Sequence, residues 1–297
     1  MGLGVLASCA EEAPQDDLAV SVPADRFGLL TISYSEHRVP GGAEPQLLMG
    51  GFFARHAGLT RDGVLSVLNL PDTPGGADLD QPVGSCRYAE RELGGTMDDD
   101  GGAFVDLLDA GSVRLTIDGR KVGLRRRSFP DIFGSVSGIT YEGALDDPTG
   151  TSGAVLVEGR GSYEVGSFMV SVTPPPVARL LEVDGAPVLG TYASLRWDAD
   201  AEVRWLPQER VVASEPLPVV VEVVALQFNR VASVRCVVDD TGSMLVPRSE
   251  LQKLAPSATA DATVRLVLRR IARARFAAAG LHSGEVMFIS RDSVLLQ

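Results

Sequence analysis

The sequence predicts an all-β protein with two β-sandwich-like domains in tandem after a short flexible N-terminal tether. Apolar and polar residues alternate with a period of two in many short runs, which is the pattern of half-buried strands. The 297 residues include 32 glycines and 18 prolines, and both residue types mark tight turns between strands. The three prolines of residues 173–178 (TPPPVA) cannot pair inside a sheet. We therefore place one domain over residues 25–175 and the second over residues 176–297.

The first predicted domain contains several strand-like runs. Residues 27–34 (FGLLTISY) and 85–92 (SCRYAERE) are two of them. Asp118-Gly119 separates two further alternating runs, which is a strong hairpin signal. Residues 154–173 give two more strands around glycines. The segments at 70–82 and 94–102 are rich in Gly, Pro and Asp and predict loops.

The second predicted domain also consists mainly of strand-like runs. Residues 217–228 (LPVVVEVVALQF) are strongly β-forming, and residues 247–255 (PRSELQKLA) predict one or two helical turns. The run at 263–277 fits either a helix or a strand, because both periods place apolar residues on one face. We choose a strand, since the neighbouring segments are β-rich.

The charge balance and the apolar pattern exclude some classes of protein. The formal net charge is −12, whereas a nucleic-acid-binding surface must be positive to replace counterions around phosphates. We therefore expect no nucleic-acid partner. No apolar run reaches the 18 residues that a membrane-spanning helix needs, and no glycine-rich phosphate loop follows a strand and opens a helix. We expect no cofactor.

The N-terminus carries a short motif. Leu6-Ala7-Ser8-Cys9 resembles the lipobox of bacterial lipoproteins, which implies cleavage before Cys9 and lipid attachment to that cysteine. Only eight residues precede Cys9 and none is basic, so residues 1–9 would be the remainder of a longer signal. Residues 10–24 begin AEEAPQDD and are typical of a solvated tether. Ala10 resembles the sorting signal for the outer membrane. The resemblance predicts an exported protein held on a membrane through Cys9.

Two further cysteines, Cys86 and Cys236, lie in strand-like runs of different predicted domains. In an oxidising compartment they could pair, and the disulfide would then join the two domains. We expect two buried free thiols and keep the disulfide as the alternative.

The second predicted domain also resembles known modules. An early Trp197, about seven strand-like runs and a proline-rich entry make residues 176–297 similar to immunoglobulin-like or fibronectin-III domains. Four stretches, at residues 108–111 (LDAG), 163–176 (YEVGSFMVSVTPPP), 195–197 (LRW) and 236–254, resemble uncharacterised exported bacterial lipoproteins. This resemblance supplies no assigned activity and leaves the ligand open.

The stretch Val237–Pro247 contains Asp-Thr-Gly-Ser, which resembles the active-site motif of aspartic proteases. A dimeric, retropepsin-like protease would use one Asp240 from each subunit, because two close carboxylates share a proton. The polar Asp239 stands where a buried strand should continue, and Asp-Asp-Thr-Gly is favourable turn chemistry. We expect a hairpin turn with an exposed Asp240 and keep the protease as an alternative.

Metal and anion sites have weaker signals. Asp98, Asp99 and Asp100 resemble part of a calcium loop, but Leu107 stands where the bidentate glutamate is expected. A Ca²⁺-dependent adhesion or glycan-binding module is therefore a second alternative. Arg125–Arg127 and the arginines between 265 and 275 are basic clusters that suit solvent-exposed strand faces or an anionic ligand. The sequence thus predicts a non-enzymatic, membrane-anchored binding or scaffold module of the cell envelope, with a protein or glycan ligand.

Overall fold

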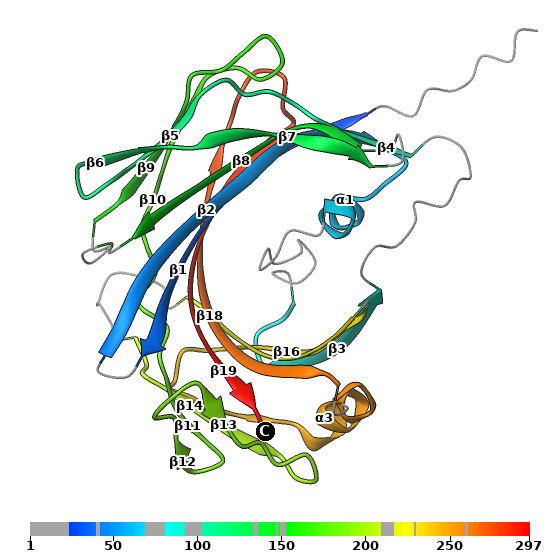
Figure 1. The fold of residues 1–297 in the computed structure, drawn as a ribbon, viewed down its shortest axis with the longest axis vertical. Helices are drawn as coiled ribbons and strands as arrows, with labels where there is room; N and C mark the ends of the chain where they lie inside the picture. The colour runs from blue at the N-terminus through cyan, green and yellow to red at the C-terminus, as the bar shows by residue number, and fades with distance from the viewer. Residues whose placement is uncertain are drawn as a thin grey trace, which may run out of the picture.

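The computed structural model describes residues 24–39, 42–68, 81–92, 103–132, 136–146, 148, 153–208, 217–228, 230–258 and 261–297. The fold is mostly β, as the sequence predicts. One large mixed sheet carries two small antiparallel sheets and two short helices (Figure 1).

The large sheet runs through the whole molecule. Ten of its strands follow one another in the order β3 (Ser85–Glu92), β16 (Arg230–Val238), β15 (Val219–Gln227), β18 (Thr263–Phe276), β19 (Ser283–Leu296), β1 (Asp25–Val39), β2 (Gly42–Ala57), β4 (Phe104–Leu107), β8 (Val136–Asp146) and β7 (Arg125–Ile132). The short β13 (Tyr192–Ala193) pairs with the end of β19. Neighbouring strands are mostly antiparallel, but β1 with β19, β4 with β8 and β13 with β19 are parallel pairs.

Strands from both sides of residue 175 share this sheet. β1 pairs with β19 in the centre, and β3 pairs with β16 at one edge. The boundary predicted at residue 175 falls between β10 (Phe168–Val172) and β11 (Leu180–Val183). The large sheet is therefore built jointly by the two predicted halves.

Each small sheet has four strands. The first, which we call the upper sheet, has the order β10, β9 (Val155–Gly159), β5 (Val113–Ile117) and β6 (Arg120–Gly123). The second, the lower sheet, has the order β12 (Ala186–Pro187), β11, β14 (Ala201–Trp205) and β17 (Ser243–Val246). The hairpin predicted at Asp118-Gly119 is confirmed, since β5 and β6 pair across it and both turn residues have positive φ.

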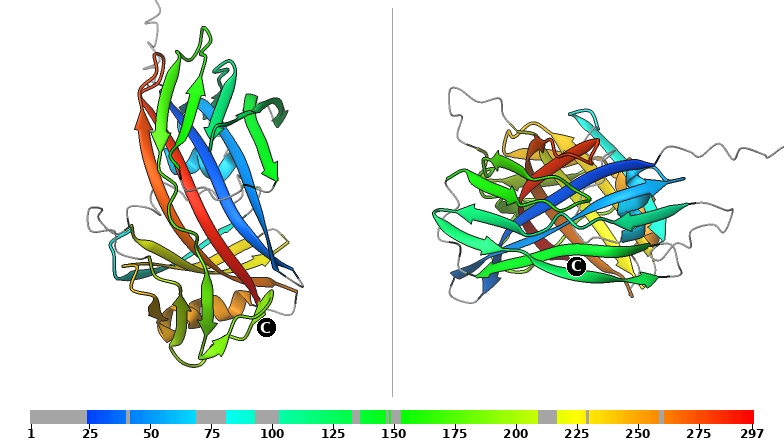
Figure 2. Two further views of the ribbon diagram at one scale, coloured as in Figure 1. Left: turned by 90° about the vertical axis from the view of Figure 1, so that its left-hand side faces the viewer. Right: turned by 90° about the horizontal axis from the view of Figure 1, so that it is seen from above.

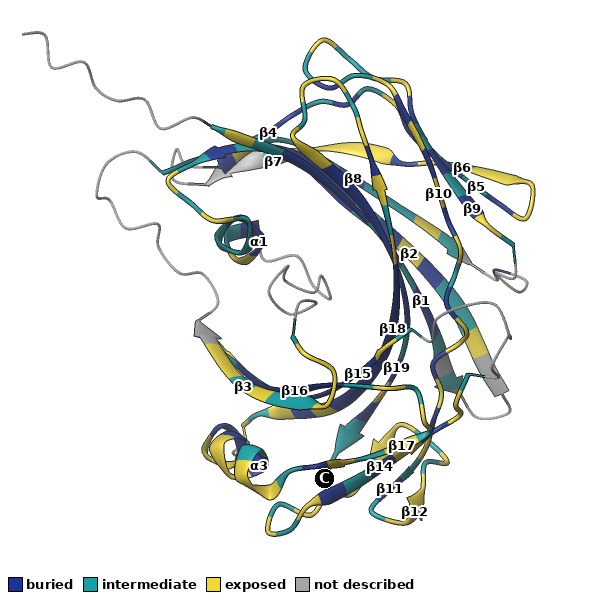
Figure 3. Ribbon diagram, turned by 180° about the vertical axis from the view of Figure 1, so that it is seen from behind, coloured by how far each residue is buried: buried dark blue, intermediate teal, exposed yellow. Residues whose placement is uncertain are grey.

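Three apolar clusters hold these layers together. One fills the space between the upper sheet and the large sheet, and a second lies between the lower sheet and the large sheet. The third covers the other face of the large sheet, where α1 (Arg61–Leu68) packs with Val64, Leu65 and Leu68. The large sheet is curved, with α1 on its concave side and both small sheets on the opposite side (Figures 1 and 3). The small sheets lie toward opposite ends of the long axis (Figures 1 and 2).

The ambiguous C-terminal run is a strand. Residues 263–276 form β18, whose side chains alternate between the two faces of the large sheet: Leu266 and Leu268 face the lower sheet, and Ile271 faces the α1 side. The predicted helical turns at 247–255 are also confirmed as α3 (Arg248–Leu254), which buries Leu251 and Leu254. No helix in the described segments is long and apolar enough to cross a membrane.

Cys86 and Cys236 form a disulfide, so the expectation of two free thiols is wrong. The two cysteines are direct cross-strand partners in β3 and β16, and opposite residues of antiparallel strands lie close enough to be bridged. The bond ties the edge strand β3 to its only partner strand among the described residues.

Candidate functional site

The upper sheet presents a polar outer face over an apolar inner one. In β5, Val113, Leu115 and Ile117 are buried while the residues between them point outward. The same alternation occurs in β9 and β10. Because side chains in a strand alternate between faces, the inner residues of all three strands pack on the large sheet and the outer ones form a separate surface.

Strand register brings particular outer residues together. Arg114 of β5 lies opposite Glu158 of β9, and Glu158 lies opposite Met169 of β10. Just beyond, the Arg160 backbone N–H donates to the Ser112 carbonyl at 3.0 Å. The consecutive strands β9 and β10 and the more distant β5 therefore contribute to one small patch at the end of the sheet.

Gly159 gives this patch its shape. Phe168 is the cross-strand partner of Gly159, and a Cβ on Gly159 would lie 2.1 Å from the Phe168 ring. The ring therefore covers the glycine and continues inward, where it stacks on Phe276 of β18 with ring centroids 4.3 Å apart. A side chain at position 159 would collide with the ring, so the ring or the strand would have to shift.

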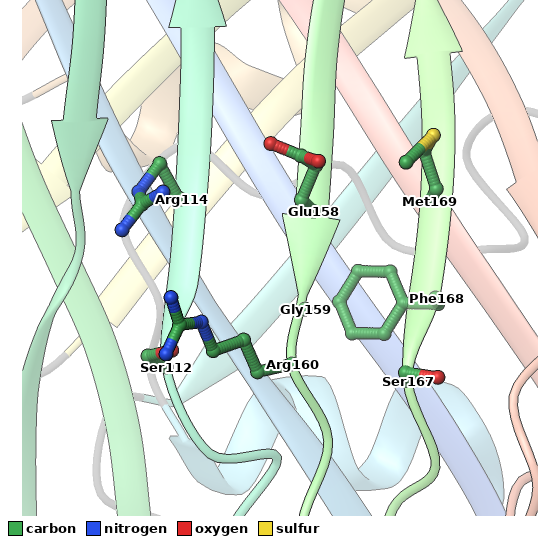
Figure 4. A pocket seen from close by; sticks show the side chains of 8 residues that line it. All are labelled: Ser112, Arg114, Glu158, Gly159, Arg160, Ser167, Phe168 and Met169. Atoms are coloured by element: carbon green, nitrogen blue, oxygen red, sulfur yellow. The ribbon is translucent and has the colours of Figure 1, made fainter.

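The patch is a pocket of about 450 Å³ lined by Ser112, Arg114, Glu158, Gly159, Arg160, Ser167, Phe168 and Met169. Figure 4 shows Arg114 and Arg160 on the β5 side, Met169 and Phe168 on the β10 side, and Glu158 between them. The volume lies within the range of roughly 300–1,000 Å³ that small-molecule sites occupy.

The charged groups of the pocket have no partner within the part of the chain that the structure describes. Among the described residues, no salt bridge or side-chain hydrogen bond joins Arg114, Glu158 or Arg160 to a partner. Two other arginines of the same part of the chain are paired, since Arg126 forms a salt bridge with Asp109 and Arg127 forms one with Glu142 at 2.5 Å. The pocket therefore offers two guanidinium groups and one carboxylate to a ligand.

Asp240, the sequence candidate for catalysis, occupies a different environment. Its side chain is 1% exposed, so the expectation of an exposed turn residue is wrong. The carboxylate accepts hydrogen bonds from Arg270 Nε at 2.8 Å, from Trp205 Nε1 at 2.7 Å and from the Gln208 backbone at 3.2 Å. These donors come from β18, β14 and the segment that follows β14, so Asp240 fastens the lower sheet to the large sheet.

The turn around Asp240 joins two sheets. β16 ends at Val238 in the large sheet, and β17 begins at Ser243 in the lower sheet. The two strands were predicted correctly, but they do not pair as a hairpin. Gly242 takes a φ of +92°, which favours glycine. Arg270 completes this junction by donating to the carbonyl oxygens of Val177 and Leu206.

The remaining sequence candidates are scattered. Cys9 and the acidic cluster Asp98, Asp99 and Asp100 lie outside the described residues. The arginines between 265 and 275 divide between the two faces of β18. Arg270 faces the lower sheet, and Arg273 pairs with Glu285.

Two histidines flank one carboxylate at the start of β1, which the sequence did not suggest. His282 Nδ1 lies 2.5 Å from Asp25 Oδ1, and the buried His56 has its Nε2 3.7 Å from Asp25 Oδ2. The hydrogen bond from His282 lowers the pKa of the Asp25 carboxyl below its ordinary value. Within the described segments, no group of three His, Cys, Asp or Glu side chains is placed to hold a metal ion.

The sequence matches no protein-family model and no curated protein. The candidate site therefore stands on its own geometry.

Proposed function

We propose that this chain is a non-catalytic binding module of the cell envelope, held at the outer membrane by lipid on Cys9. The lipobox-like Leu6-Ala7-Ser8-Cys9 and the acidic segment after it support the anchoring. The disulfide between Cys86 and Cys236 is consistent with an oxidising compartment. A single lipid chain gives only weak attachment, so stable anchoring needs several chains.

The pocket on the outer face of the upper sheet carries the binding part of the proposal. Two arginines that have no partner among the described residues share one pocket in a chain whose net charge is −12. Acidic groups are abundant in this chain, yet neither guanidinium group pairs with one in the described segments. This favours an anionic ligand from outside. Arginine suits this role because its planar fork of N–H donors matches carboxylate and phosphate oxygens.

The architecture is consistent with a binding module. Each small sheet and the part of the large sheet beneath it form a two-layer, sandwich-like unit, which we take as the structural form of the two predicted domains. A site on the outer face of such a unit can bind a ligand without any change in the core. The upper unit would present the pocket, and the lower unit would complete the scaffold.

A binding titration tests the ligand part. Purified wild-type protein is titrated with glutarate and with inorganic phosphate, followed by NMR chemical shifts, and compared with the double variant Arg114→Gln/Arg160→Gln. We expect saturable shifts in the wild type and none in the double variant. Equal responses of the two proteins, at equal melting temperatures, would contradict the proposal.

Metabolic labelling tests the anchoring part. The protein is expressed in its native host with labelled palmitate, beside the variant Cys9→Ala. We expect label in the wild type and in the membrane fraction, and neither in the variant. Absence of label from both proteins would overturn the lipid anchor and leave the binding titration unaffected.

A further inference from the structure

The carboxylate of Glu158 restricts which anion the pocket accepts. It stands between the strands that carry Arg114 and Met169, directly opposite both residues in register. It forms no salt bridge with Arg114 within the described residues, although the two residues are cross-strand partners. A purely anionic ligand would bring negative charge against this carboxylate, and like charges at close range repel.

We propose that the pocket binds a ligand carrying both carboxylate and ammonium groups, namely an acidic amino acid or a peptide end of the same charge. The proposal rests on the binding function assigned above to the same pocket. Two guanidinium groups and one carboxylate line the site. The complementary ligand has two carboxylates and one ammonium group, so each charge of the ligand meets an opposite charge of the protein.

The arrangement of the groups sets the orientation of the ligand. Arg114 and Arg160 lie toward β5, and Glu158 stands between them and Met169 (Figure 4). The carboxylates therefore lie over β5, where each can accept a forked pair of N–H bonds. The ammonium group donates to Glu158. Ser112 and Ser167 also line the pocket, and their hydroxyls can form hydrogen bonds with the outer part of the ligand.

The β10 side of the pocket accepts an apolar part. Met169 is 65% exposed at the edge of the pocket, which Phe168, the residue before it, also lines. A flexible, polarizable thioether adapts to aliphatic groups of varied shape. A peptide end would place its next aliphatic side chain here, which a free amino acid cannot do.

Two probes that differ by one group test the proposal. Glutamate has two carboxylates and an ammonium group, whereas glutarate has the two carboxylates alone. Each probe is titrated at neutral pH into wild-type protein and into Glu158→Gln, with dissociation constants from NMR shifts of the upper sheet. Lys121→Gln serves as a control, because Lys121 is an exposed basic residue of β6 in the same sheet and does not line the pocket.

We expect the Glu158→Gln substitution to act in opposite directions on the two probes. It removes an attraction for glutamate and a repulsion for glutarate, so glutamate binds about fivefold more weakly and glutarate more tightly, on the scale of partly exposed ion pairs. Arg160→Gln weakens both probes by a similar factor. Lys121→Gln changes either constant by much less than Arg160→Gln does.

Two outcomes would overturn the inference separately from the proposed function. If Glu158→Gln tightens both probes, the pocket recognises anions alone, and the binding function survives without the ammonium contact. If glutarate, glutamate and inorganic phosphate all fail to shift the wild-type spectrum, the binding function and the inference fall together. Unchanged melting temperatures show that the variants are folded and make either result decisive.

Discussion

The upper and lower sheets are alike in size and in their place on the large sheet, but they are attached by different chemistry. The upper sheet contacts the large sheet through rings, with Phe168 stacked on Phe276 and tilted against Phe53. The lower sheet has a comparable apolar core, but its contact also contains the buried pair of Arg270 and Asp240.

Further polar contacts fix the lower sheet and the segment that leads into it. The Leu180 backbone N–H donates to Asp292 of β19 at 2.7 Å, and Arg38 of β1 donates to the same carboxylate and to the Leu180 carbonyl. Directional bonds of this kind specify one position, whereas apolar packing tolerates small displacements.

The outer faces of the two small sheets differ in whether their charged side chains are paired. On the lower sheet, Arg204 pairs with Glu182 and Glu202, so its charge is met within the sheet. On the upper sheet, Arg114 and Arg160 have no such partner among the described residues. At the contact between the lower sheet and the large sheet, buried charges thus hold the fold together. The upper sheet packs on the large sheet through an apolar cluster that includes the phenylalanine rings, and we propose that its two arginines bind a ligand.

The substitution Arg270→Met should have the largest effect. It leaves the Asp240 carboxylate buried without its cation, which typically costs about 3–5 kcal/mol of unfolding free energy. The measurement is guanidinium unfolding at neutral pH. Arg204→Met is the matched control, because its ion pairs are exposed and should add little stability. Similar losses of unfolding free energy in the two variants would contradict the difference between buried and exposed ion pairs.

The double substitution Cys86→Ser/Cys236→Ser should come next. The bond joins residues 150 positions apart, so its removal frees a long loop in the unfolded chain and costs about 2–4 kcal/mol. Unfolding of the wild type with and without reductant gives the same comparison without a mutation. An unchanged midpoint in both experiments would show that pairing of β3 with β16 suffices without the bond.

A smaller loss is expected for Phe168→Leu in the upper sheet. The substitution keeps an apolar side chain but removes the stacked ring pair, which is worth about 0.5–1.5 kcal/mol beyond area burial. Met169→Leu, one residue along and exposed, is the control and should leave stability unchanged. If the two variants have equal melting temperatures, ring stacking does not contribute to the attachment of the upper sheet to the large sheet.

Two buried carboxyls, those of Glu285 and Asp292, should contribute to the pH dependence of stability with opposite signs. Burial raises the pKa of Glu285, but hydrogen bonds from Arg273 and Arg61 outweigh it, so the pKa lies below its ordinary 4.5. Its contribution to stability is therefore present above pH 4.5 and is lost as the pH falls through the lower folded pKa. Glu285→Gln should flatten this acid limb.

Asp292, under the lower sheet, should behave in the opposite way. Burial raises its pKa above 3.8, and the Leu180 N–H and Arg38 offset this only in part. Its contribution is present below pH 3.8 and is lost as the pH rises through the folded pKa. Asp292→Asn should therefore steepen the acid limb of the variant relative to wild type. Unfolding curves collected between about pH 3 and pH 6 check both signs, and equal slopes would contradict them.

Local sequence signals were sufficient where the structure is local. Asp118-Gly119 predicted its hairpin because the turn requires positive φ at both residues. The strand at 263–276 followed from alternation in a β-rich chain. These features depend on neighbours within a few positions.

Local sequence patterns gave wrong predictions, or none, where the structure brings together segments that are distant in the sequence. Asp240 was expected to be exposed because its turn is polar, but Arg270 arrives from another strand and buries it. The disulfide depends on the register between β3 and β16, which no local pattern specifies. The pocket likewise needs β5, β9 and β10 in register. Only the outward position of Arg114 in an alternating run hinted at it.

The parallel pairing of β1 with β19 has a consequence for the order of folding. Arg26 and His282, which contact each other beside this pair, are 256 residues apart. Contacts between such distant segments form slowly, because a long loop must close first. β19 also lies between β1 and β18 in the centre of the large sheet. A nascent chain that has not yet reached Ser283 therefore leaves β1 and β18 as open edges, and the centre of the sheet is completed last.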